Sequence, residues 1–282
     1  MNPEVLDRLN QVRESALARG VPPAEVERWL ESARPCAALT PDGDGPVVGR
    51  FGGPLLLPVE SPDPPARTYL ITSIDLAALP ADATTLPLPS DGVLNLLARS
   101  ADDGFDAGGE AVYVPAGTPV AERPLSPGHS PKDPWANMGR GPLEGTELRL
   151  RREVSLPDCE AMYDSAEHPH AAELRDAWQS VRDEDRSRGR SLLRIDGYAR
   201  DPYGEFDMLH VAASLRARRE GRSPGEPASA WAAPRPADWA LLAQWYGGVY
   251  VYGDVYWTVT RENLAERRFK EVDVLGYIEG PA

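Results

Sequence analysis

The segment Asp201–Asp207 gathers side chains of the kind that perform hydrolytic chemistry. Asp201, Glu205 and Asp207 supply three carboxylates, and His210 adds an imidazole within ten residues. Such groups hold divalent metals and exchange protons. The segment also contains a proline and a glycine, which favour a solvated turn, and the sequence offers no EF-hand spacing or HExxH motif to complete a metal site. We therefore expect no catalytic residue, metal or cofactor, with a metal-assisted hydrolase or nuclease using Asp201–Asp207 as the alternative.

A second candidate site lies in the strand predicted over Val249–Val259. Successive side chains of a strand point to opposite faces, so one face is apolar and the other carries Tyr250, Tyr252, Asp254 and Tyr256. Hydroxyl-bearing aromatic rings around a carboxylate are typical of a polar ligand groove or a protein contact. Two alternatives stay open. The tyrosines pack beneath a helix or loop, or the glycine–aspartate pair in mid-strand forms a hairpin turn that mixes the two faces.

The predicted binding site joins this strand to two other segments. Asp254 is its strongest member, because a charge on a partly covered sheet face is tolerated only when something hydrogen-bonds it. If a ligand supplies that bond, Asp254→Asn should abolish binding and leave the melting temperature almost unchanged. If the protein supplies it, the role of Asp254 is structural. The complete predicted set is Tyr198, Gln244, Tyr250, Tyr252, Asp254 and Tyr256.

Composition excludes several classes of function. The chain has 282 residues, a formal charge of −14 and a pI of about 4.8, and no basic run marks a nucleic-acid or anionic-membrane surface. Cys36 and Cys159 are too few for a disulfide framework. No secretory signal or membrane-spanning stretch is recognisable. We expect a cytoplasmic protein that contacts neither nucleic acid nor membrane.

Periodicity predicts a sheet-rich α+β fold. Residues 1–35 should form an N-terminal pair of helices, and residues 36–282 an α+β domain. Two proline-rich segments, 115–146 and 220–236, should be long surface connections without regular structure. Further helices are predicted over Ala171–Arg188, Leu209–Arg219 and Arg261–Phe269. Strands are predicted over Pro54–Val59, Tyr69–Ile74, Val93–Ala98, Val112–Pro115, Leu148–Ser155, Trp239–Gln244, Val249–Val259 and Val272–Ile278.

Two segments of the sequence have a similar pattern. Residues 45–115 hold a glycine pair, an apolar strand and a Gly-Val strand, and residues 190–282 hold comparable segments in the same order. A duplicated unit gives such a pattern, and chance similarity of short glycine-plus-strand segments gives it too.

These same segments resemble the YwqG-like family, a bacterial domain family of unknown function. The resemblance covers about residues 35–280 and rests on the following pieces: Arg50-Phe-Gly-Gly-Pro54, Leu57-Pro58, Asp75-Leu76, Leu79-Pro80, Gly92-Val-Leu94, Gly197-Tyr198, Leu242-Ala-Gln244, Gly253-Asp254-Val-Tyr256 and Glu262-Asn-Leu264, with Phe269 after them. The chain departs from the family where Ser73 replaces the usual glutamine. Some members are encoded near toxin genes, so the resemblance implies an immunity or antitoxin-like role as one form of binding. We expect a binding protein without catalytic activity that recognises a polar ligand or a protein partner.

Overall fold

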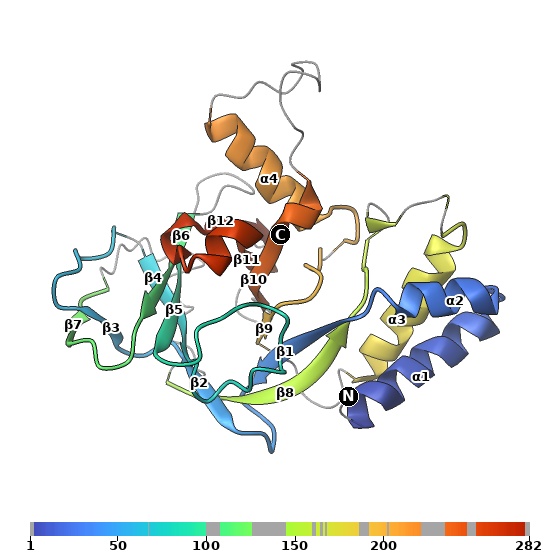
Figure 1. Ribbon diagram of the computed structural model, residues 1–282, viewed down its shortest axis with the longest axis horizontal. Helices are drawn as coiled ribbons and strands as arrows, with labels where there is room; N and C mark the ends of the chain where they lie inside the picture. The colour runs from blue at the N-terminus through green and yellow to red at the C-terminus, as the bar shows by residue number, and fades with distance from the viewer. Residues whose placement is uncertain are drawn as a thin grey trace.

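The computed structural model describes residues 3–66, 68–99, 108–125, 145–159, 162–163, 166, 168–185, 192–201, 203–220, 235–246 and 252–279. Most strands of this part of the chain form one ten-stranded antiparallel sheet in the order β12-β11-β10-β9-β1-β8-β2-β4-β5-β6 (Figure 1). Its strands are β1 (Arg34–Thr40), β2 (Val47–Phe51), β4 (Thr68–Asp75), β5 (Val93–Arg99), β6 (Gly108–Val114), β8 (Glu147–Ser155), β9 (Leu193–Ile195), β10 (Trp239–Tyr246), β11 (Tyr252–Thr260) and β12 (Asp273–Glu279). A separate pair consists of β3 (Leu55–Pro58) and β7 (Val120–Arg123).

The large sheet curls until its two end strands approach each other. The indole Nε1 of Trp257 in β11 donates a hydrogen bond to the carbonyl of Leu97 in β5, at 3.1 Å. The ring of Tyr113 in β6 lies 5.6 Å from that of Phe269, just before β12. The inner face therefore encloses the main apolar core, which includes Trp257, fully buried.

Three helices form a second core outside the sheet. α1 (Pro3–Ala18), α2 (Pro23–Leu30) and α3 (Ala171–Asp185) lie together beside β1 and β8 (Figure 1). Trp29 and Trp178 pack at the centre of this layer, against Val154 and Leu156 from the end of β8. Proline opens α2 at its first position, where no amide hydrogen is required. This layer places α3 beside the outer face of the sheet.

A fourth helix, α4 (Met208–Arg219), covers the other end of that outer face. Asp207 caps it, because its Oδ1 accepts a hydrogen bond from the amide of Leu209 at 2.9 Å. Its apolar residues pack on side chains from β10, β11 and β12, among them Tyr256. The short helix α5 (Arg261–Ala265) follows β11. Two 3₁₀ turns, η4 (Pro236–Asp238) and η5 (Phe269–Glu271), precede β10 and β12.

The prediction of a sheet-rich α+β fold with an N-terminal pair of helices is confirmed. Gly253 and Asp254 lie inside one continuous strand, so the hairpin alternative is wrong. The expectation that 115–146 lacks regular structure is wrong at β7, which pairs with β3. The remainder of the two proline-rich segments lies largely outside the described residues, at 126–144 and 221–234. The boundary between residues 35 and 36 and the internal duplication stay predictions.

No helix in the described stretches combines the length and apolar character needed to cross a membrane.

Candidate functional site

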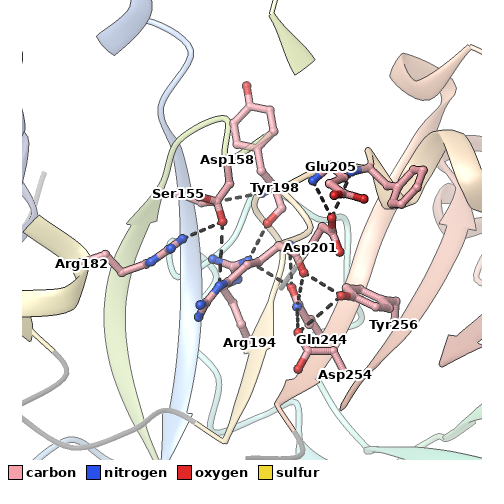
Figure 2. A network of polar contacts seen from close by, with 12 residues as sticks. Ser155, Asp158, Arg182, Arg194, Tyr198, Asp201, Glu205, Gln244, Asp254 and Tyr256 are labelled. Atoms are coloured by element: carbon pink, nitrogen blue, oxygen red, sulfur yellow. Dashed lines mark hydrogen bonds and ion pairs between the residues drawn. The ribbon is translucent and has the colours of Figure 1, made fainter. Parts of the chain in front are cut away.

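A line of polar side chains crosses adjacent strands on the outer face of the sheet. Register places Arg194 of β9 opposite Gln244 of β10, and Gln244 opposite Tyr256 of β11. Paired residues of neighbouring strands share one face, so these three side chains project together. We call the polar centre the group that they form with nearby charged residues (Figure 2). Its members are Asp158, Arg182, Arg194, Arg200, Gln244, Asp254 and Tyr256.

The back of the polar centre holds the main chain of Arg200. The Gln244 carboxamide accepts a hydrogen bond from the Arg200 amide at 2.9 Å and donates one to the Arg200 carbonyl at 2.8 Å. The hydroxyl of Tyr256 donates to the same carbonyl at 2.7 Å. Three hydrogen bonds from two strands therefore fix this residue without using its guanidinium.

Asp254 belongs to this supporting layer. It is only 8% exposed, and its Oδ2 accepts a hydrogen bond from Gln244 Nε2 at 2.8 Å. The Tyr256 hydroxyl, whose proton points to the Arg200 carbonyl, is 3.4 Å from the same oxygen and makes a weaker, shared contact with it. Burial raises the pKa of Asp254 to about 6, although Arg200 and the two hydrogen bonds oppose the shift. Side chains of the protein thus supply the partners of this carboxylate, and those contacts are structural.

A tight turn after β9 connects the polar centre to the N-terminal helical layer. Asp196 and Gly197 both have positive φ, 68° and 87°, a conformation that glycine adopts without strain. After this turn the Tyr198 carbonyl accepts a hydrogen bond from Arg194 Nη2 at 2.6 Å. The Tyr198 hydroxyl donates to the Ser32 carbonyl at 3.0 Å. The Tyr198 side chain therefore contacts the segment after α2, and only its main chain contacts the polar centre.

The front of the polar centre contains charged groups with incomplete hydrogen bonding. Asp158 is 4% exposed, and its Oδ2 accepts a hydrogen bond from Arg182 Nη1 at 2.6 Å. Arg200 Nε lies 4.0 Å from the same oxygen. Within the described part of the chain, Asp158 Oδ1, Arg182 Nε and Arg194 Nε are buried without a hydrogen-bond partner. Buried polar atoms are paired in the great majority of cases, so these three atoms distinguish the front from the fully bonded back.

Tyr246, at the end of β10, lies next to these cations. The Arg194 guanidinium is 5.8 Å from the centre of its half-buried ring. Burial raises the pKa of Tyr246 to about 12, and the nearby positive charges of Arg194 and Arg200 act in the opposite direction. The Arg182 side chain is also largely covered, and burial lowers the pKa of its guanidinium. Several positive charges therefore share a poorly solvated space.

The Asp201–Asp207 carboxylates have a different use. Asp201 Oδ2 accepts hydrogen bonds from the amides of Glu205 and Phe206, at 2.7 and 3.0 Å, and Asp207 caps α4. Burial raises the pKa of Asp207. Over the described ranges, no group of three or more histidine, cysteine or acidic side chains is arranged to hold a metal ion. These acids shape the loop that leads into α4.

Two other features, the cysteine thiols and a separate groove, are candidate sites apart from the polar centre. Cys36 is fully buried, and desolvation raises the pKa of its thiol to about 12. A groove of about 290 Å³ lies between α1, the β1–β2 turn and β8. Two of its arginines, Arg8 and Arg151, lie against Glu153, at 3.9 and 2.6 Å. Neither feature shares the incomplete bonding of Asp158, Arg182 and Arg194.

The structure brings together only part of the predicted binding set. Gln244, Asp254 and Tyr256 are in direct contact, and Tyr198 touches them through its main chain. Tyr250 and the side chain of Tyr252 lie outside the described residues. Tyr256 is fully buried under α4, as the packing alternative anticipates. Whether the set binds a ligand stays a prediction.

Sequence reasoning did not anticipate the charged front of the polar centre. Asp158 follows β8, Arg182 lies on α3, and Arg194 lies in a strand of three residues. These segments are far apart in the chain. The one available signal was Arg194 itself, a charged residue between the apolar residues Leu193 and Ile195 directly before the predicted Gly-Tyr turn.

A scan against protein-family models and a search of curated proteins find no match to the chain. The resemblance to the YwqG-like family therefore stays a prediction from the residues themselves.

Proposed function

We propose that this protein binds a small polar ligand at the front of the polar centre and does not catalyse a reaction. One observation carries the proposal. Among the described residues, Asp158 Oδ1, Arg182 Nε and Arg194 Nε are buried next to one another's side chains with no hydrogen-bond partner. Burying such atoms unpaired costs free energy, and a bound ligand would remove that cost.

The proposal assigns different tasks to the two layers of the polar centre. Gln244, Asp254 and Tyr256 position the main chain of Arg200 from behind, and so act on the ligand indirectly. The side chains of Arg182 and Arg200 are about one-fifth exposed, 19% and 23%, so part of each is open to solvent. Binding sites of this type combine a few orienting polar groups with a rigid support.

The metal-assisted hydrolase has less support. Asp201 and Asp207 already accept hydrogen bonds from backbone amides, which leaves less of their capacity for a metal or a proton transfer. A protein partner, including the immunity or antitoxin-like role, has no contact in the structure that favours it over a small ligand. We retain the cytoplasm as the proposed compartment, in keeping with the buried thiols of Cys36 and Cys159.

We also propose that the sheet arose by duplication of a five-strand unit. The strand order is a palindrome if the strands are matched in chain order. The matched pairs are β1 with β8, β2 with β9, β4 with β10, β5 with β11 and β6 with β12. In this arrangement β1 and β8 are exchanged, since each lies next to the second strand of the other unit. Chance gives such a complete correspondence less readily than duplication.

Local geometry supports this matching. After β2, Gly52 and Gly53 have φ of 60° and 90°, and after β9, Asp196 and Gly197 have 68° and 87°. The register between β4 and β5 shifts after Leu70, and the register between β10 and β11 shifts after Leu241. Matched strands thus repeat their irregularities as well as their order.

Matched side chains also bond to matched carbonyls. Asn95 of β5 donates to the carbonyl of Leu56 at 3.4 Å, and Tyr256 of β11 donates to that of Arg200 at 2.7 Å. Leu56 and Arg200 each stand six residues after an arginine, Arg50 in β2 and Arg194 in β9. The proposed ligand site is therefore a specialisation of the second unit.

A thermal-shift screen against small polar metabolites tests the proposed function. A ligand bound only by the folded protein raises the melting temperature by mass action. The expected hit loses its effect in Arg182→Gln and Arg200→Gln, and keeps it in the matched control Arg50→Gln, which alters an exposed arginine. A panel without any such hit would refute the binding function. Stabilisation by Mn²⁺, Mg²⁺ or Zn²⁺ that is lost in Asp207→Asn would favour the hydrolase instead.

A further inference from the structure

The chemistry of the polar centre narrows the class of ligand, and this inference rests on the proposed binding function. Figure 2 shows the side chains of Arg182 and Arg194 near the carboxylates of Asp158 and Asp254. Arg200 is the third cation, with its Nε 4.0 Å from Asp158 Oδ2. Asp201 is nearby, but its carboxylate bonds to the backbone amides of its own loop. Hydrogen bonds to neutral amides leave the charge of Asp201 in place, so three guanidiniums stand with three carboxylates here, in a chain whose formal charge is −14. Buried charged groups are normally also fully hydrogen-bonded, and within the described residues two arginines and one aspartate of this group are not.

The unpaired atoms specify the hydrogen bonds that a ligand must make. Arg182 Nε and Arg194 Nε are hydrogen-bond donors, and each needs an acceptor. Asp158 Oδ1 is an acceptor and needs a donor. In the described part of the protein, none of these three atoms has a partner. A complementary ligand must therefore accept hydrogen bonds from two arginines and also donate one to a carboxylate.

We infer that the front of the polar centre binds a protonated phosphate group, with its oxygens on the arginines and its P–OH on Asp158. Guanidinium groups match phosphate oxygens in geometry and charge. The hydroxyl of a protonated phosphate supplies the donor that Asp158 requires. Sulfate has the same shape and lacks that donor, so Asp158 should discriminate against it. The ring of Tyr246, 5.8 Å from the Arg194 guanidinium, borders the site.

The phosphate can be free or part of a monoester. Inorganic phosphate keeps at least one hydroxyl at any pH near neutrality, whereas a phosphomonoester loses its last proton with a pKa of about 6. Both sources therefore offer the required group at about pH 6. Ordered water is the competing occupant, because a water molecule can also satisfy unpaired buried atoms.

Isothermal titration calorimetry at about pH 6 and constant ionic strength tests the inference, with inorganic phosphate, O-phosphoserine and sulfate as the three titrants. We expect inorganic phosphate to bind at least about tenfold more tightly than sulfate, the effect of one charge-assisted hydrogen bond. O-phosphoserine should bind if the site accepts monoesters. If it does not bind, the ligand is inorganic phosphate. Equal affinity for phosphate and sulfate, or no binding of either, would overturn the inference.

Two variants and one control locate the binding. Arg200→Gln removes a guanidinium but leaves the main-chain hydrogen bonds of Arg200 in place, and we expect it to weaken phosphate at least about tenfold. Arg50→Gln should change nothing. Asp158→Asn replaces the acceptor by a donor and should erase the preference for phosphate over sulfate. Phosphate binding that is equal in Arg200→Gln and Arg50→Gln would place the anion elsewhere and refute the site.

The outcome also separates this inference from the function on which it rests. If neither phosphate nor O-phosphoserine binds, but the metabolite screen yields a ligand that Arg182→Gln and Arg200→Gln abolish, the binding function stands and the phosphate inference fails. If the screen and the titrations both give nothing, the binding function fails as well.

Discussion

Replacing Asp254 by asparagine should change how the stability of the protein depends on pH. The carboxylate is buried, and burial raises its pKa from an ordinary 3.8 to about 6. Above that pKa, Asp254 is charged in both the folded and the unfolded chain, and the folded state bears the cost of burying the charge. Below about pH 4 it is protonated in both states, and this cost is absent. The native protein therefore gains stability from this group as the pH falls from 6 toward 4.

The size of the effect follows from the shift. One pKa unit corresponds to about 1.4 kcal/mol, so the raised pKa of Asp254 corresponds to about 3 kcal/mol between the two ends of that window. Asparagine has nearly the same shape and no charge to bury. The contacts of its amide group with Gln244 and Tyr256 do not change with pH, so they add the same amount to the free energy of unfolding at every pH. The change in free energy of unfolding caused by Asp254→Asn should therefore shift by about 3 kcal/mol in favour of the variant between about pH 4 and pH 8.

Urea unfolding of the wild type and the variant across this pH range measures the effect. Subtracting the two curves cancels the acid denaturation caused by all other carboxylates. Asp44→Asn, at an exposed position, serves as the control and should leave the difference flat. A difference for Asp254→Asn that does not vary with pH would refute the assignment of Asp254 as a buried, costly charge.

Three further outcomes follow from the packing. Trp257→Ala should lower the free energy of unfolding by about 3–5 kcal/mol in denaturant titrations, because the fully buried indole fills the main core and bonds to Leu97; a loss below about 1 kcal/mol would contradict its place there. Tyr256→Phe should cost about 1 kcal/mol in the same assay, since it removes one of the hydrogen bonds to the Arg200 carbonyl, and a silent substitution would show that this bond adds nothing. Cys36 should resist alkylation in the native state at about pH 8, where the raised pKa keeps its buried thiol protonated; mass spectrometry that finds rapid labelling without unfolding would disprove its burial.

Local sequence signals account for most of the fold. The longer strands and helices are recognisable because each has an apolar pattern of sufficient length and a Gly or Pro boundary. The four strands missed by this reasoning, β1, β2, β7 and β9, have at most seven residues and each contain an arginine. Leu193–Ile195 has only three residues with an arginine at its centre, and Arg34–Thr40 begins with an arginine and a proline. Such strands form because neighbours on both sides supply the pairing, which no local pattern encodes.

Only the residues that support the candidate site from behind could be predicted from the sequence. Gln244, Asp254 and Tyr256 lie in strands whose alternation can be read from the sequence. Asp158 and Arg182 meet only after β8, α3 and β9 have assembled, and their charges carry little information in a chain whose 30 basic residues are almost all arginine. Alternation also predicted two unlike faces for β11, one of them open. Both are covered, because α4 packs on the face that the sheet does not enclose.

The two proposed units show how one of them could gain a site that the other lacks. In the first unit, the positions matched to Gln244 and Tyr256 carry the shorter side chains Ser73 and Asn95, whose hydroxyl and amide bond to each other at 2.7 Å. Asn95 then reaches the carbonyl of Leu56 by a single long hydrogen bond.

In the second unit, the side chains of Gln244 and Tyr256 are longer. They form hydrogen bonds with both the amide and the carbonyl of Arg200. Because these hydrogen bonds use only the main chain of Arg200, its guanidinium is not needed to hold the loop. Its Nε lies 4.0 Å from Asp158 Oδ2. The corresponding residue of the first unit, Leu56, has no charge to present and is 44% exposed. Side-chain length on two adjacent strands therefore decides which half of the sheet holds this loop by both its amide and its carbonyl, and so places an arginine beside a buried carboxylate.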